Sequence, residues 1–477
     1  MASAPSPQPP RPSVAPAHAQ QHTIRVTATR VSHYFISFAC VQGLLFLWRI
    51  VYGAGSKHAE LRRAQMLLSL EYLMLPMTIL IWNRLQPLIA EATRAIAISA
   101  SVWRTFVGVL LAFAHCCFPF YYILVSTEPH WLALTCLVSY ALYIHFGAIL
   151  FAAFLAENIL ARLKGVVPKL ELLGPPWWRR FLWCTKVHTA IALVAAVSFT
   201  LFGLYATNLA PFIKRVDVEI DDLSPKFHGV RIALLTDVHI GPSVGRKRVA
   251  DVVDLVNSLK PDLIAISGDL VDGELERLAE AARPLADLRT KYGVFYATGN
   301  HEYYHGNIDD WMKYFKTLGI HSLHNANRRF RADGSECAQS AADSECICIA
   351  GIDDISAQYS RISNHHMNLS MALKGCHTQL ETTLLLAHQP SAAVEALDEV
   401  QKTHQKLDLI LVGHTHGGQM YVIAPMAYFV NKYFLGLYRH ERTRAQVYVS
   451  AGVNYWGPPV KIYGLNEITL ITLVRKR

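Results

Sequence analysis

The most informative stretch of the sequence is residues 409–418, which read Leu-Ile-Leu-Val-Gly-His-Thr-His-Gly-Gly. Four large aliphatic residues in a row predict a short strand that is buried on both faces. Two histidines and then two glycines follow this strand directly. In open α/β sheets, ligands bind at the carboxyl ends of the strands. The stretch therefore predicts a buried strand that presents two histidines to a functional site.

Four more apolar runs of this kind come earlier in the chain, and each ends in a polar cluster. The runs are residues 232–235, 263–266, 294–297 and 383–386. The clusters that close them are Asp237-Val238-His239, Gly268-Asp269, Gly299-Asn300-His301-Glu302 and Ala387-His388. The first three clusters are spaced by about 30 residues, which suits βαβ units, and helical periodicity covers 249–259 and 276–288. We expect an α/β domain in which five strand ends converge.

The residue types in these clusters predict a site for two divalent metal ions. The seven candidate ligands are Asp237, His239, Asp269, Asn300, His388, His414 and His416. Seven ligands are too many for one ion. Mixed imidazole and carboxylate ligands suit Mn, Fe or Zn, and the set contains no cysteine, which argues against a structural zinc site. Two such ions can stabilise the attacking and leaving oxygens of an in-line displacement at phosphorus.

The order DxH, GDxxD, GNHE, H and GHxH resembles the motifs of the calcineurin-like metallophosphoesterase superfamily. The sequences at 413–419, 436–438 and 455–459 are similar, more specifically, to those of the vertebrate-type transmembrane proteins with a metallophosphoesterase domain. The resemblance covers 216–477, and the helices before it match in layout only. It implies a two-sheet β-sandwich flanked by helices, with later strands near 445–450 and 468–473.

The resemblance also implies a role for each residue of the site. Asp237, His239 and His416 would bind the first metal ion, Asn300, His388 and His414 the second, and Asp269 would bridge both. His301 would be the catalytic residue, which stabilises the transition state or protonates the leaving oxygen. The implied activity is that of a metal-dependent phosphoric ester hydrolase (metallophosphoesterase). It would hydrolyse a phosphomonoester or phosphodiester by in-line attack of a metal-bridging hydroxide.

The neighbours of these motifs allow two interpretations each. Asp272 is expected either to hold a ligand histidine from outside the metal shell or to cap a helix. Tyr303, Tyr304 and His305 are expected either to line the substrate cleft or to be ordinary surface residues. The alternative function is a non-catalytic membrane scaffold or receptor with a vestigial phosphoesterase domain, which a lost ligand or a lost His301 would have favoured.

The residues before 216 predict a membrane domain. Residues 1–33 are expected to form a disordered Pro/Ala-rich tail and a basic segment, and residues 34–207 the membrane domain. Residues 208–215 are expected to be a linker to the catalytic domain at 216–477. About five transmembrane helices are expected, because a helix needs about 20 apolar residues to cross the bilayer. The five apolar segments lie near 34–53, 66–83, 105–126, 131–156 and 187–207. Ionisable residues inside such segments are functional candidates, and here they are Glu71, His115 and His145.

The charge distribution excludes nucleic acid as a partner. The chain has 477 residues and a formal net charge of +9. Residues 1–215 hold 18 Lys and Arg against 6 Asp and Glu, whereas residues 216–477 hold 27 against 30. The excess therefore lies in the membrane part, and the catalytic part lacks the clustered positive charge that phosphate backbones require.

The Lys and Arg residues near the membrane predict the orientation of the chain. Eleven lie on the side of the N-terminus and five on the other side, which places the N-terminus in the cytoplasm and the catalytic domain on the exoplasmic face. An N-glycosylation acceptor sequence at Asn368 and a possible pairing of Cys337 with Cys346 agree with this. The short linker holds the site near the bilayer. We therefore expect a phosphoester substrate, with a membrane-bound or lipid phosphoester and a soluble one both open.

Overall fold

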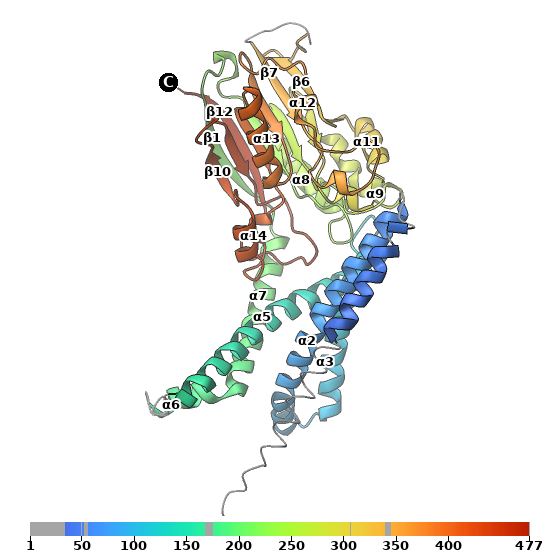
Figure 1. Ribbon diagram of the computed structural model, residues 1–477, viewed down its shortest axis with the longest axis vertical. Coiled ribbons are helices and arrows are strands. Elements are labelled where there is room, and N and C mark those ends of the chain that lie inside the picture. The colour runs from blue at the N-terminus through green and yellow to red at the C-terminus, as the bar shows by residue number, and fades with distance from the viewer. Residues whose placement is uncertain are drawn as a thin grey trace, which may run out of the picture.

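The computed structural model describes residues 34–48, 50–51, 56–166, 175–305, 307–338 and 345–476. A bundle of long helices carries an α/β domain at one end (Figure 1). The tail expected over residues 1–33 lies outside the described residues.

The membrane domain contains helices at all five apolar segments. They are Tyr34–Trp48, α2 (Ser56–Ile96), α3 (Ala100–His115) with α4 (Cys117–Ile123), α5 (Trp131–Val166) and α7 (Thr185–Asn208). In the described residues, three helices are long and apolar enough to span a membrane, namely Leu61–Ile96, Trp131–Lys164 and Thr185–Asn208. A fourth span results if α3 and α4, which meet at a bend of 52°, count as one. The described part of the first helix is shorter than a span.

The loops of the membrane domain lie at two opposite ends of the bundle. The short helix α6 (Pro176–Trp183) lies far from the α/β domain, as does the turn between α2 and α3 (Figure 1). The loop between α4 and α5 instead contacts α8 (Arg246–Ser258), where Thr127 O accepts a hydrogen bond from Arg246 N at 2.9 Å. This grouping of loops is the one that the charge argument assumed, although it does not assign either end to a compartment.

The α/β domain consists of two six-stranded mixed sheets. The first sheet has the order β1-β12-β2-β3-β4-β5 and the second β10-β11-β9-β8-β7-β6. The strands of the first sheet are β1 (Phe212–Ile220), β12 (Glu467–Arg475), β2 (Arg231–Leu235), β3 (Leu263–Ser267), β4 (Val294–Ala297) and β5 (Ile320–Ser322). The strands of the second are β10 (Gly436–Arg439), β11 (Gln446–Val449), β9 (Leu409–Val412), β8 (Thr382–Leu386), β7 (Cys346–Gly351) and β6 (Ala326–Arg331). The five strands expected before the polar clusters are β2, β3, β4, β8 and β9, so the predicted sandwich is confirmed.

The inner faces of the two sheets form one hydrophobic core. Leu234 and Phe295 of the first sheet and Leu384, Leu411 and Tyr448 of the second are fully buried in the same cluster. Because both faces of each central strand are covered, these strands are mostly apolar and do not alternate between apolar and polar residues. Helices cover the outer faces: α8, α9 (Leu275–Ala282) and α11 (Ile308–Thr317) pack on the first sheet, and α12 (Leu369–Ala372) and α13 (Pro390–Thr403) pack on the second.

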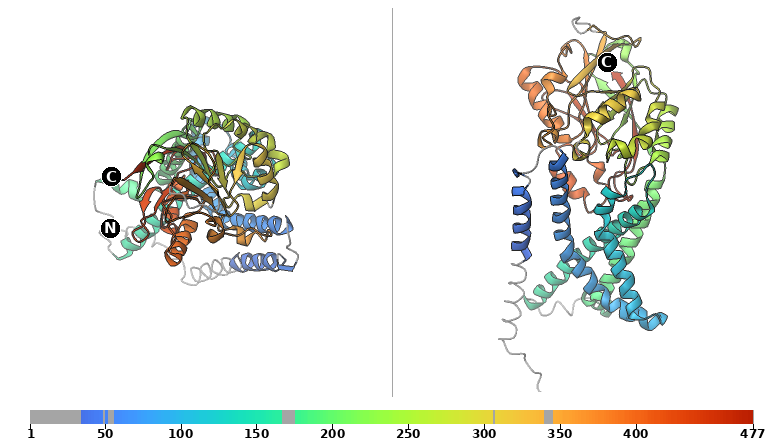
Figure 2. Two further views of the ribbon diagram at one scale, coloured as in Figure 1. Left: turned by 90° about the horizontal axis from the view of Figure 1, so that it is seen from above. Right: turned by 90° about the vertical axis from the view of Figure 1, so that its right-hand side faces the viewer.

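The last membrane helix continues almost directly into the α/β domain. β1 begins at Phe212 and pairs in parallel with β12, so residues 212–215 belong to the sheet rather than to the linker expected at 208–215. The strand was not predicted because the charged residues Lys214 and Arg215 interrupt the apolar run that would have indicated it. Thr207 of α7 also donates a hydrogen bond to Pro459 O at 2.7 Å. The α/β domain is therefore held close to the end of α7, as Figure 2 also shows.

Candidate metal centre

The seven candidate ligands all lie at the carboxyl ends of strands, from both sheets. Asp237 and His239 follow β2, Asp269 follows β3 and Asn300 follows β4, while His388 follows β8 and His414 and His416 follow β9. Glycines let these strand ends approach each other: a Cβ atom at Gly299 would overlap Asp269, and one at Gly413 would overlap Thr236 and Asp237. Steric crowding between the strand ends therefore explains why glycine occupies these two motif positions.

Five of the seven ligand residues have a left-handed backbone. The φ angles are 55° for Asp237, 52° for His239, 51° for Asp269, 70° for His414 and 49° for His416. Non-glycine residues in this region cost about 1–3 kcal/mol each and persist where the surroundings enforce them, typically at functional sites. The left-handed backbone at these residues therefore costs conformational free energy, and it directs their side chains towards one another.

The first group of ligands consists of Asp237, His239 and His416. Nε2 of His416 lies 3.2 Å from Oδ1 of Asp237 and 3.1 Å from Nε2 of His239. These atoms form one of the groups in the described residues that are close enough to hold a metal ion. Burial lowers the pKa of His416 to about 3, so its imidazole is neutral and can act as a ligand at neutral pH.

The second group consists of Asp269, His388 and His414, with Asn300 beside them. Nε2 of His388 lies 3.0 Å from Oδ2 of Asp269, and the rings of His388 and His414 are 5.2 Å apart. Burial, together with the charge of His388, lowers the pKa of His414 to about 4. Asn300 donates from Nδ2 to the hydroxyl of Tyr304 at 2.9 Å, which leaves its Oδ1 for another partner.

Asp269 lies between the two groups. Its Oδ2 is 3.0 Å from His388 of the second group and 3.8 Å from His239 of the first. Its Oδ1 accepts a hydrogen bond from the backbone N of His301 at 2.9 Å. Burial alone would raise the pKa of Asp269, but the neighbouring histidines hold it well below its usual range. A charged carboxylate with one oxygen facing both groups suits a bridging ligand.

Buried polar atoms without partners test whether cations fit this site. Oδ1 of Asn300 is buried and makes no hydrogen bond within the described part of the chain, and the buried Nε2 of His388 makes none either, although it lies 3.0 Å from the carboxylate of Asp269. Such orphaned atoms cost about 1–3 kcal/mol each unless something satisfies them. Metal ions held by oxygen and imidazole ligands would do so, and the two buried carboxylates, Asp237 and Asp269, would neutralise part of their charge. The donor set therefore fits divalent cations; their presence and type stay a prediction.

His301 is oriented by Asp272. Nδ1 of His301 lies 2.7 Å from Oδ1 of Asp272, and Nδ1 of His239 lies 2.9 Å from the same oxygen. Burial would lower the pKa of His301, but the carboxylates of Asp272 and Asp269 outweigh it and raise the pKa to about 9. Asp272 is fully buried, and α9 is preceded by Glu274, so Asp272 holds histidines and does not cap this helix.

A membrane helix completes this network. The hydroxyl of Tyr121, on α4, donates a hydrogen bond to Oδ2 of Asp272. Tyr121 is itself buried. The membrane domain therefore contacts the group that positions both His239 and His301, and no motif in the sequence indicated this contact.

Glu302 is a second residue whose role the sequence did not reveal. Its carboxylate accepts hydrogen bonds from the backbone N of Leu270 at 2.6 Å and of Gly299 at 2.7 Å, with longer ones from Asp269 and Val271. It thereby joins the loops after β3 and β4. Glu302 is the last residue of the GNHE motif. A glutamate in a turn after a buried strand was the one feature of the sequence that could have indicated this structural role.

The two tyrosines after His301 have different surroundings. Tyr303 is buried, and its hydroxyl lies 3.0 Å from Oγ1 of Thr298, so it belongs to the core. Tyr304 is half-buried, and its ring centroid lies 4.8 Å from that of His301 with the rings tilted; it lines a small cavity with Arg62 and Arg63 of α2. The side chain of His305 lies outside the described residues.

Of the three ionisable residues singled out in the membrane helices, Glu71 and His115 contact each other and His145 lies apart from them. His115 forms an ion pair with Glu71, and its Nε2 lies 2.8 Å from Oγ1 of Thr78. His145 is fully buried and stacks on Tyr421 of the α/β domain, with ring centroids 5.1 Å apart. These contacts assign packing partners to all three residues, and any further role is untested.

Comparison with known proteins shows which family this chain resembles. Residues 230–418 match the family model described as calcineurin-like phosphoesterase. A protein of Danio rerio named transmembrane protein with metallophosphoesterase domain is 34% identical over 87% of this chain and 90% of its own length. Its namesake in Bos taurus is 35% identical over 86% of this chain and 89% of its own. A Caenorhabditis elegans protein, named as a metallophosphoesterase, is 40% identical over 76% of this chain and 72% of its own.

Proposed function

The chain belongs to the family of transmembrane proteins with a metallophosphoesterase domain, and we propose that it is a membrane-tethered phosphoesterase that depends on two divalent cations. The observation that carries the proposal is the pair of adjacent candidate ligand groups, in which Asp269 of the second group lies 3.8 Å from His239 of the first. All seven expected ligands and His301 converge there, which argues against a vestigial domain in a scaffold or receptor.

The residues of the site divide the chemistry between them. Two divalent cations in the two groups would acidify a water and neutralise the charge of the phosphoryl oxygens. His301 is held through Nδ1 by Asp272, so its Nε2 faces the centre, 4.0 Å from Oδ2 of Asp269. From there it can donate a proton or a hydrogen bond to an oxygen of the ester. Left-handed backbone and buried partners keep the ligands in place before the substrate binds.

Removal of the metal ions is expected to abolish phosphoester hydrolysis. The full-length protein in nanodiscs would be treated with EDTA and assayed on p-nitrophenyl phosphate and bis(p-nitrophenyl) phosphate. We expect the rate to fall at least about a hundredfold, because cations supply several kcal/mol of charge stabilisation. Mn²⁺, Zn²⁺ or Fe²⁺ should restore it. If the metal-loaded protein hydrolyses no phosphoester, soluble or lipid, the scaffold function replaces the proposed one.

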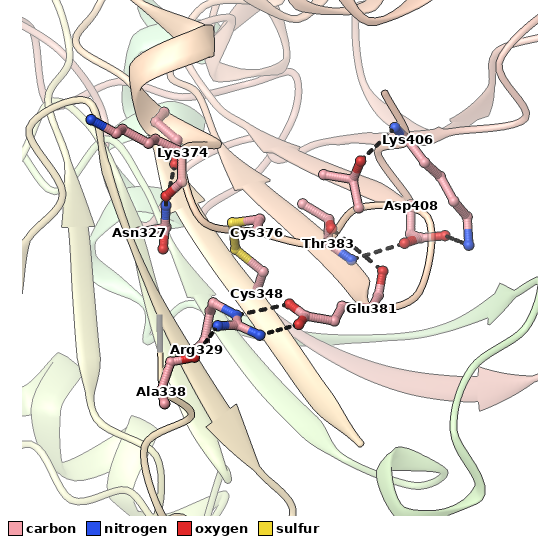
Figure 3. The surroundings of a disulfide bond; sticks show 12 residues. Asn327, Arg329, Ala338, Cys348, Lys374, Cys376, Glu381, Thr383, Lys406 and Asp408 are labelled. Atoms are coloured by element: carbon pink, nitrogen blue, oxygen red, sulfur yellow. Dashed lines mark hydrogen bonds and ion pairs between the residues drawn. A yellow bond between two sulfur atoms is a disulfide. The ribbon is translucent and has the colours of Figure 1, made fainter. Parts of the chain in front are cut away.

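We also propose that the catalytic domain lies on the exoplasmic face, and the cysteines support this. All four cysteines of the catalytic domain are paired, as Cys337–Cys346 and Cys348–Cys376, whereas the five in the membrane domain are free. The second bond joins β7 to the segment before β8, beside the buried ion pair of Arg329 and Glu381 (Figure 3). Structural disulfides persist in oxidising compartments. The expected pairing of Cys337 with Cys346 is present in the structure.

Cysteine labelling tests this orientation. The denatured full-length protein, with thiols trapped before lysis, should add five maleimide groups without reductant and nine with it, because five of the nine cysteines are free. Cys348→Ser should raise the first number by one, since it releases Cys376. Nine additions without reductant would place the domain in a reducing compartment.

A further inference from the structure

A cavity of about 590 Å³ lies between the metal centre and the membrane helices. Two candidate ligands, His414 and His416, form one end of it. Side chains of the membrane domain form the opposite walls, among them Leu67 and Leu70 of α2, Phe118 of α4 and Ile144 of α5. The cavity therefore connects the site of the proposed reaction with the helices that lie in the bilayer.

The lining of this cavity suits an alkyl chain. A small, water-soluble phosphoester would gain nothing from apolar walls on the far side of the metal centre. An alkyl chain would gain about 0.8 kcal/mol for each methylene group that leaves water. A site with mostly apolar walls and a few polar groups at one end suits a ligand that has an apolar chain and a polar head group.

The helix α14 (Ala424–Val430) forms another wall and has an apolar outer face. Met426, Ala427 and Val430 line the cavity. On the outside, Phe429 is 82% exposed and the neighbouring Tyr428 is 61% exposed. Figure 1 shows α14 at the end of the catalytic domain that faces α5 and α7. Exposed aromatic and aliphatic side chains beside membrane helices are typical of a segment that dips into the bilayer interface.

Two arginines of α2 lie close to the metal centre. The guanidinium group of Arg62 lies 5.6 Å from the ring centroid of Tyr304, whose hydroxyl contacts Asn300. Arg62 and Arg63 line a small cavity that shares Met66 with the larger one. The guanidinium group of Arg63 lies 5.5 Å from the ring centroid of Tyr122, so in the described part of the chain both arginines contact aromatic rings and can also pair with a phosphate group.

We propose that the substrate is a membrane lipid whose head group is a phosphoester. Its alkyl chains would lie in the cavity between α2, α5 and α14, and its phosphate would lie at the metal centre beside Arg62 and Arg63. This inference rests on the proposed phosphoesterase function and names its substrate class. The lipid would enter from the bilayer past α14, without crossing water.

The reaction is hydrolysis of the lipid phosphoester. The oxygen of a water molecule forms a bond to phosphorus, and the bond between phosphorus and the alcohol oxygen breaks. The alcohol leaves with a proton, and the second product is the phosphate or phosphomonoester. No oxidant, reductant or further reactant is consumed.

A bulky residue in the cavity tests the proposal. Full-length protein with Mn²⁺ in nanodiscs would be assayed on phosphatidic acid, phosphatidylglycerol, p-nitrophenyl phosphate and bis(p-nitrophenyl) phosphate. Leu70→Trp fills the cavity, whereas Leu73→Trp, on the same helix at a side chain that is 74% exposed, is the matched control. We expect Leu70→Trp to lower the ratio of lipid to soluble turnover at least tenfold and Leu73→Trp to leave it unchanged.

A second readout does not depend on turnover. Metal-free protein would be crosslinked with phosphatidic acid that carries a diazirine in its acyl chain. We expect adducts in the segments 66–70 and 420–430, and their loss in Leu70→Trp but not in Leu73→Trp.

Hydrolysis of the soluble esters alone, with neither lipid cleaved, would overturn the lipid proposal and leave the phosphoesterase function intact. An unchanged ratio in Leu70→Trp, or adducts only elsewhere, would overturn it as well. Absence of any turnover would contradict the phosphoesterase function itself.

Discussion

Asp269→Asn is expected to lower phosphoester hydrolysis at least about a thousandfold. Oδ2 of Asp269 lies 3.0 Å from Nε2 of His388 in the second group and 3.8 Å from Nε2 of His239 in the first. The amide has nearly the same shape but lacks the negative charge. Loss of about 4 kcal/mol of charge stabilisation corresponds to roughly a thousandfold, at about 1.4 kcal/mol for each factor of ten.

Metal content distinguishes this explanation from misfolding. We expect the variant to keep its circular dichroism spectrum but to bind fewer than two Mn²⁺ ions, and to gain less thermal stability from Mn²⁺ than the wild type, because ligands stabilise only the state that binds them. Asp310→Asn, at an exposed position on α11, is the matched control and should change nothing. Full activity with Asn at position 269 would show that the reaction takes place elsewhere.

The core of the fold and the candidate ligands were accessible from the sequence because each depends on short stretches. The five apolar strands are buried on both faces, so continuous runs of aliphatic residues mark them. The ligands follow the strands directly, and the parallel neighbours β2, β3 and β4 bring their ends to one edge. Local sequence and topology together were sufficient to predict that Asp237, Asp269 and Asn300 lie together.

The remaining features depend on contacts between residues far apart in the chain. Tyr121 and Asp272 are separated by 151 residues, and nothing in a run of membrane-helix residues marks one tyrosine as a donor to the catalytic domain. The pairing of Cys348 with Cys376 depends on where β7 and the segment before β8 lie. Residues 212–215 were misassigned because β1 carries charged residues at the edge of its sheet. The cavity between α2 and His416 likewise exists only after the two domains pack.

His301→Ala is expected to slow hydrolysis about a hundredfold to ten thousandfold without loss of metal. General acid catalysis contributes about this much, and His301 is the only candidate site residue outside the two ligand groups. Its Nδ1 lies 2.7 Å from Asp272, which fixes the ring, so its Nε2 is available to the ester. His366→Ala, at an exposed position, is the control.

The leaving group separates the two roles considered for His301. If the imidazolium protonates the leaving oxygen, the loss in His301→Ala should be large for an alkyl phosphate, whose alkoxide is a poor leaving group, and at least tenfold smaller for p-nitrophenyl phosphate, whose phenolate leaves without a proton. If His301 instead stabilises charge on the phosphoryl oxygens, both esters should lose equally. Two bound Mn²⁺ ions in the variant are required in either case, since the ring is held by Asp272 and not by a metal group. Wild-type rates on both esters would remove His301 from the catalytic machinery and leave the ligand groups to supply the catalysis.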